Sequence, residues 1–262
     1  MYDDIRIYSL KSIDLRGATV IDGFPSVGLV SSVVANYIVN AIHLEQVGTM
    51  ESSAFPTVSL IRDTEPQTPV RIYAGSKNDT PSSEKVVAFI SEFQPPPNLT
   101  KSIASTILEW AEEQRCDLII SPEGLVVERE TEEVKEYSRK DENVKVYGVA
   151  STKRAKELIN TPEVLPFQEG VITGIAAVLL NEGKRRDFNV ISLLAEAHPN
   201  YPDARAAASI IEIVAKLLLK THIDLKPLYD EAARIESQIK TIQKQTTMSA
   251  PQKHIPSPSM YG

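Results

Sequence analysis

Apolar runs of strand length that alternate with longer helical segments constrain this fold more than any other feature of the sequence. In residues 85–91, Val86, Val87, Phe89 and Ile90 occur without polar alternation, as in a strand that is buried on both faces. Comparable runs occupy residues 19–22, 118–121, 144–150 and 189–195. The alternation indicates a mainly parallel sheet with helices on both faces. We therefore expect one three-layer α/β/α domain over residues 1–222.

Two helices and one turn are expected to form the interior of this domain. The turn Gly23-Phe24-Pro25-Ser26-Val27-Gly28 leads into a helix over residues 26–42, which is apolar on several sides and is therefore buried or at an interface. A longer helix is expected over residues 202–220. Consecutive strands separated by prolines indicate an antiparallel extension of the sheet. These strands are expected at residues 45–50, 57–61 and 70–75.

From Leu225 onward the chain changes character. Apolar residues recur at alternating spacings of three and four, the pattern of a helix with one apolar seam. The seam consists of Leu225, Leu228, Ala232, Ile235, Ile239 and Ile242. We expect an amphipathic helix over residues 223–245, with its seam against its own domain or against a neighbouring subunit. The candidate oligomer-interface residues are Leu228, Ile235, Ile239 and Ile242. Residues 246–262 are rich in proline and polar residues, and we expect a flexible tail.

The composition of the 262 residues excludes several classes of protein. The formal net charge is −7, whereas binders of nucleic acids and anionic membranes need a basic surface. No apolar run approaches the ~20 residues that span a membrane, and no secretory signal is visible. The single cysteine, Cys116, has no internal disulfide partner and is expected to be a buried thiol. We expect a cytoplasmic protein with protein or small-molecule partners.

Three residues are candidates for chemistry, and each also has a structural explanation. The spacing around Ser26 differs by one residue from the Gly-x-Ser-x-Gly pattern of a nucleophile elbow. Ser26 is better placed to cap the helix that follows. Glu123 follows a strand but has no partner carboxylate. His198 also follows a strand, yet nearby Asp203 suits the N-terminus of the next helix. Because no phosphate-binding glycine motif and no metal-ligand spacing occur, we expect no catalytic residues, no metal and no cofactor.

Two stretches resemble the proteasome assembly chaperone family. Ile21-Asp22-Gly23-Phe24-Pro25-Ser26-Val27-Gly28 is similar to the opening strand and turn of that family. Gly170-Val171-Ile172-Thr173-Gly174-Ile175, the strand after it and Pro202-Asp203-Ala204 are similar to its second half. The resemblance covers roughly residues 5–220. It implies a three-layer fold similar to purine nucleoside phosphorylases, and self-assembly into homo-oligomers in archaeal-type members.

The chain ends in Met260-Tyr261-Gly262, which resembles the hydrophobic-Tyr-any ending of proteasome core-particle partners. The resemblance implies an ATP-independent assembly chaperone or proteasome-binding cap, whose terminal carboxylate and tyrosine ring enter pockets between α-subunits. Met260, Tyr261 and Gly262 are thus the predicted partner-binding residues. The predicted partners are the proteasome α-subunits and further copies of this chain. Two alternatives are an enzyme, either nucleoside-phosphorylase-like or hydrolase-like, built on the three candidates above, and an oligomeric scaffold with an idle tail.

Overall fold

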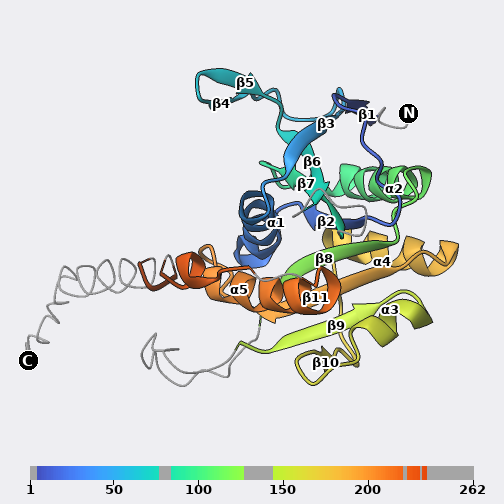
Figure 1. Cartoon of the computed structure of the whole chain (residues 1–262), viewed down its shortest axis with the longest axis vertical. Helices are drawn as coiled ribbons and strands as arrows, with labels where there is room; N and C mark the ends of the chain where they lie inside the picture. The colour runs from blue at the N-terminus through green and yellow to red at the C-terminus, as the bar shows by residue number, and fades with distance from the viewer. Residues whose placement is uncertain (1–4, 77–83, 127–143, 221–222, 231, 235–262) are drawn as a thin grey trace, which may run out of the picture.

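The computed structural model describes residues 5–76, 84–126, 144–220, 223–230 and 232–234 (Figure 1). Within these ranges, a nine-stranded sheet forms the centre of the molecule. In spatial order its strands are β1 (Arg6–Ser9), β3 (Glu45–Glu51), β6 (Val70–Ser76), β7 (Lys85–Ser91), β2 (Thr19–Gly23), β8 (Leu118–Leu125), β11 (Val190–Glu196), β9 (Val146–Ala150) and β10 (Leu165–Pro166). The helices are α1 (Val30–Ala41), α2 (Pro97–Glu113), α3 (Lys153–Leu158), α4 (Gly174–Arg186) and α5 (Ala204–Ile213).

The centre of the sheet is parallel, and its flanks contain antiparallel pairs. Strands β7, β2, β8 and β11 run in one direction, with Ile21 of β2 opposite Ile120 of β8. Strands β6, β3 and β1 continue beyond β7 as antiparallel neighbours, and β9 is antiparallel to β11 on the other side. The predicted three-layer α/β/α fold and its antiparallel extension are confirmed.

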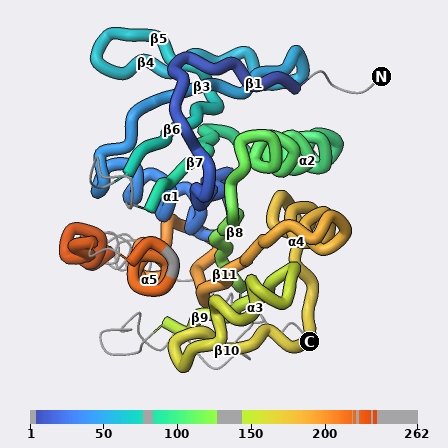
Figure 2. The backbone as a smooth tube through the Cα atoms, turned by 45° about the vertical axis from the view of Figure 1, so that its right-hand side comes forward, coloured from blue at the N-terminus to red at the C-terminus, as the bar shows by residue number. Residues whose placement is uncertain are grey.

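The helices divide between the two faces of the sheet. Helices α1 and α5 pack against each other on one face, and α2 and α4 do so on the other (Figure 2). Alternate residues of the central strands point to opposite layers. Ile21 and Ile120 therefore join the α1–α5 cluster, whereas Val20 and Ile119 join the α2–α4 cluster. Burial on both faces explains why these strands lack polar alternation.

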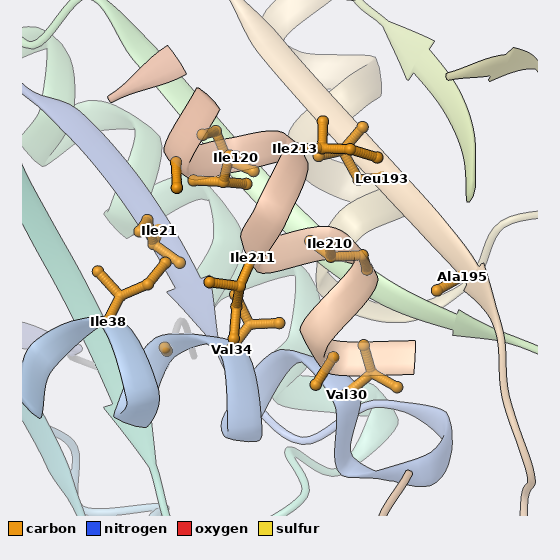
Figure 3. Packing of buried hydrophobic residues seen from close by; sticks show 14 of the residues in the cluster. Ile21, Val30, Val34, Ile38, Ile120, Leu193, Ala195, Ile210, Ile211 and Ile213 are labelled. Carbon is orange, nitrogen blue, oxygen red and sulfur yellow. The ribbon is translucent and has the colours of Figure 1, made fainter. Parts of the chain in front are cut away.

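Small side chains allow α5 to pack closely against its surroundings. Ala206, Ala207 and Ala208 are fully buried, although they lie on different sides of the helix. Figure 3 shows Ile211 of α5 beside Val34 of α1, with the central strands on the far side of α5. The helix predicted to be buried or at an interface is thus buried within its own chain.

Two helix boundaries differ from the prediction. Helix α1 begins at Val30 and not at residue 26, because Gly28 and Leu29 have left-handed backbone angles, with φ of 60° and 50°. A 3₁₀ turn, Val27–Leu29, precedes the helix. The helix predicted over 202–220 ends as regular α-helix at Ile213 and continues as a π-helical turn, Val214–Leu218. Hydrophobic spacing defines the buried face, but backbone angles decide where a helix begins and ends.

A separate two-stranded sheet, formed by β4 (Leu60–Arg62) and β5 (Glu65–Gln67), projects from the body near β1 and β3 (Figure 1). We call residues 58–67 the arm. The strand predicted at 57–61 belongs to the arm and not to the main sheet. Helix α3 and strand β10 lie at the opposite end of the molecule from the arm (Figures 1 and 2).

Candidate functional site

Two loops and the end of one strand meet at the carboxyl edge of the central strands, which is where open α/β folds bind ligands. They are the turn over residues 24–28, the end of β8 and the segment that links β11 to α5. A β-carbon on Gly124 would lie 2.2 Å from the carbonyl oxygen of Val27. One on Gly28 would lie 2.8 Å from the carbonyl oxygen of His198. These segments are therefore in backbone contact, and the fold brings the three sequence candidates to one edge.

Ser26 supports the start of α1. Its Oγ accepts a hydrogen bond from the backbone N–H of Ser31 at 3.1 Å, and the hydroxyl of Ser31 donates to the carbonyl oxygen of Phe24. These bonds satisfy a backbone donor in the first turn of the helix and fix the shape of the turn before it. The N-cap residue of α1 is Leu29, so the prediction that Ser26 caps a helix beginning at its own position is wrong, although its hydroxyl accepts from a donor in the first turn of α1.

Asp22 is a buried carboxyl group behind this turn, and it was not among the sequence candidates. The residue is 1% exposed. Its Oδ1 accepts from the N–H of Phe24 at 3.0 Å, and its Oδ2 accepts from the hydroxyl of Ser121 at 2.7 Å. Burial raises the pKa of Asp22 to about 6, although both hydrogen bonds act to lower it. Ser121 lies 99 positions away in the sequence, so the contact depends on the pairing of β2 with β8.

Asp22 is also the acidic partner that the sequence did not provide for Glu123. Burial and the charge of Asp22 raise the pKa of Glu123 well above its ordinary value. The charge of Asp22 thus favours a bound proton on Glu123 in the folded protein.

His198 is held by Asp203. Its Nδ1 lies 2.9 Å from Oδ2 of Asp203, and its backbone N–H donates to the same oxygen at 3.0 Å. The other oxygen of Asp203 accepts from the N–H of Ala206 at 3.0 Å and so caps α5. Burial acts to raise the pKa of Asp203, but the hydrogen bonds from His198 and Ala206 outweigh it and lower the pKa. The structural role predicted for this loop, with Asp203 at the helix N-terminus, is confirmed.

The predicted docking end lies outside the described residues, as does half of the seam. These residues are Met260, Tyr261 and Gly262 of the tail and Ile235, Ile239 and Ile242 of the seam. Leu228 and Ala232 are described, and both are buried in the α1–α5 cluster of their own chain. The hydroxyl of Tyr37 in α1 also donates to the carbonyl oxygen of Asp224. The start of the seam therefore packs against its own domain, and an intersubunit role for the remainder stays a prediction.

Other features of the described ranges concern metals, membranes and the cysteine. No group of three or more His, Cys, Asp or Glu side chains in these ranges could hold a metal ion. No helix in them is long and apolar enough to cross a membrane. Cys116 is buried, and burial together with the charge of Asp117 raises its pKa to about 12. Cys116 is thus the buried thiol predicted from the sequence.

By its fold the protein is a three-layer α/β/α protein, with close backbone contacts between segments at the carboxyl edge of its central strands. Residues 20–243 match the model of the PAC2 family, and the chain belongs to this family. The membership that the sequence motifs predicted, in the family of proteasome assembly chaperone homologues, is confirmed.

Solved structures share this fold along nearly the whole chain. The crystal structure of Pyrococcus furiosus PbaA, an archaeal homolog of proteasome-assembly chaperone, superposes with a TM-score of 0.76 at 26% identity, and 94% of each chain is covered. Pyrococcus furiosus PbaB, an archaeal proteasome activator, has a TM-score of 0.76 at 22% identity, with 93% of this chain and 100% of that chain covered. An uncharacterised protein of Methanocaldococcus jannaschii is 25% identical over 259 residues, which are 98% of this chain and 99% of that protein.

Proposed function

We propose that this protein is an ATP-independent chaperone or cap that binds the proteasome core particle. The supporting observation is its likeness to PbaA, a homolog of proteasome-assembly chaperone, across 94% of both chains. Because the likeness includes the antiparallel flanks as well as the parallel centre, it is not limited to a core that many α/β proteins share.

The contact that we propose is made by the last three residues. The terminal carboxylate pairs with a lysine in a pocket between two α-subunits, and the ring of Tyr261 buries its face while its hydroxyl finds a polar partner. Met260 fills an adaptable apolar contact. Residues 246–262 would reach ~55–60 Å when fully extended, which allows the end to leave its own domain and enter a pocket on a neighbouring ring.

We also propose that the protein is a cyclic homo-oligomer of three or more copies. Each copy then contributes one tail, and the second and later tails bind as intramolecular events at a high effective concentration. Individually weak contacts are sufficient for stable capture under this arrangement.

The test is capture of the full-length protein by purified proteasome α-rings. Deletion of Met260–Gly262, or Tyr261→Ala, should abolish capture and leave the mass of the oligomer and its melting temperature unchanged. Extra residues after Gly262 should have the same effect, because they displace the carboxylate, and loss of its charge-assisted hydrogen bonds costs about 1.5–3 kcal/mol per tail. If the extended chain is captured as well as the wild type, the docking proposal is wrong.

Catalysis has no part in this proposal, because the hydroxyl of Ser26 accepts from the backbone of α1, Asp203 caps α5 and His198 is held by Asp203. His198→Ala and Glu123→Gln therefore serve as controls at the carboxyl edge, and both should be captured like the wild type. Loss of capture by His198→Ala in a folded oligomer would favour the enzymatic alternative.

A further inference from the structure

The arm presents apolar and acidic side chains together, at one end of the molecule. Ile61 is 67% exposed and Val58 is 51% exposed. Asp63, in the turn between β4 and β5, and Glu65, the first residue of β5, are exposed as well. An isolated two-stranded sheet with such side chains is marginally stable in water, so its persistence requires support from the body or from a partner.

Support from the body comes from a charged anchor at the base of the arm. Arg71 of β6 is fully buried and forms an ion pair with Glu92, and it donates to the carbonyl oxygen of Thr68 at 2.9 Å. Arg62 of β4 reaches the same carboxylate of Glu92 at 3.0 Å. Arg62 is thus engaged by Glu92 of the body, and Asp63 and Glu65 remain as exposed acidic side chains at the tip of the arm.

The opposite end of the molecule carries a groove of complementary character. It has a volume of about 550 Å³ and lies between α3 and strands β9 and β10. Its lining includes Ile159, Val164, Leu165, Lys153, Lys156 and Glu157. Both lysines are exposed, and Leu165 on the edge strand is 39% exposed. The groove is therefore apolar inside, with more basic than acidic charge at its rim.

We propose that the arm of one copy occupies this groove on the next copy, with Ile61 against Leu165 and the acidic tip beside the two lysines. Charge complementarity selects a second copy of this chain as the occupant, because each copy carries both halves of the contact at opposite ends (Figures 1 and 2). The contact is made by side chains and not by strand addition, because β10 has two residues and one is proline.

A contact between two different surfaces is head-to-tail, and such contacts close into rings when the rotation between neighbours permits. This inference rests on the proposed homo-oligomer and is independent of the proteasome contact. It specifies which surfaces join the copies.

The first experiment measures the native mass of the full-length protein at micromolar concentration. Ile61→Asp should disable the arm and Leu165→Asp the groove, so each variant should have the mass of a monomer. Both positions are exposed, and the melting temperature should stay close to that of the wild type. Val171→Asp is the matched control, because Val171 is 84% exposed but belongs to neither surface, and this variant should keep the oligomeric mass.

A mixture of the two disabled variants distinguishes head-to-tail contact from any symmetric one. The Leu165→Asp chain retains an intact arm and the Ile61→Asp chain an intact groove, so the mixture should form a dimer and nothing larger.

Exchange of charge between the arm and the groove is a second test. Asp63→Lys with Glu65→Lys should weaken assembly about tenfold, and adding Lys153→Glu with Lys156→Glu in the same chain should restore it.

An oligomeric wild type whose mass survives both Ile61→Asp and Leu165→Asp would overturn this interface while leaving the proposed oligomer and its docking tails intact. A monomeric wild type would overturn the interface and the oligomer together. Monomeric variants whose mixture stays monomeric would also refute the head-to-tail arrangement.

Discussion

Asp22 places a carboxyl group beyond the reach of water at the point where β2 becomes a turn. The hydrogen bond from Phe24 shapes that turn, and the hydrogen bond from Ser121 ties β2 to β8. Because the pKa is raised to about 6, the folded state holds the proton more tightly than the unfolded chain does. The ionised carboxylate therefore lowers the free energy of unfolding, and this loss develops as the pH rises from about 4 through about 6.

Asp22→Asn should remove this pH dependence. An asparagine can still accept from Phe24 and contact Ser121, but it carries no charge. The free energy of unfolding in urea, compared with that of the wild type, should rise by up to about 3 kcal/mol at about pH 7.5 and change little at about pH 4. Asp117→Asn, at an exposed carboxylate, is the control and should match the wild type. If Asp22→Asn loses as much stability between these pH values as the wild type, the buried charge is not the cause.

The residues at the carboxyl edge differ in how far sequence could predict them. The cap Asp203 was predictable, because a cap acts on backbone groups only a few positions away. Ser26 was predicted as a cap at the wrong place, because the left-handed angles of Gly28 and Leu29 delay the start of α1. The link between Asp22 and Glu123 was not predictable, since it needs the lateral order of strands that are distant in the chain. The lack of polar alternation in β2 indicates that Asp22 is buried, but it does not identify the side chains that lie next to Asp22.

The two residues of the ion pair that anchors the arm should differ in how much stability is lost when each is replaced. Glu92→Ala leaves the charge of fully buried Arg71 without its partner, which is expected to cost about 3–5 kcal/mol in the free energy of unfolding. Arg71→Met removes the buried charge itself and leaves Glu92 paired with Arg62, so the cost should be smaller. Denaturant unfolding of both variants measures the difference. Equal costs would mean that the pair acts through packing and not through charge.

The start of the seam and its later residues should respond differently to substitution. Leu228 is 6% exposed within its own domain, so Leu228→Ala should lower the free energy of unfolding by about 2–5 kcal/mol without changing the oligomeric mass. Ile235→Asp combined with Ile239→Asp should weaken assembly if these positions belong to an intersubunit surface. Light scattering and thermal unfolding separate the two effects. An unchanged mass with lowered stability in the double variant would place the whole seam within one subunit.

At the scale of the molecule, the layer architecture could be predicted because it depends on periodicity. Runs such as residues 85–91 are apolar throughout, so their strands had to be buried on both faces. The departure of the arm from the main sheet was not predictable, because the strand at 57–61 resembles any edge strand in composition. The reversal at β9 likewise depends on the path that the chain takes after β8, and hydrophobic spacing does not encode this path.

The alanines of α5 restrict how the core of this protein can change over generations. Ala206, Ala207 and Ala208 are already at the smallest side-chain size and are fully buried, so any replacement that enlarges them must move a helix or a strand. On the other face, Leu99, Ile103 and Ile107 of α2 are larger residues that can exchange volume with their neighbours. Because α2 also has the buried alanines Ala104 and Ala111, and α5 the larger Ile210 and Ile211, drift in the core is restricted at the alanines and permitted at the larger residues of both layers.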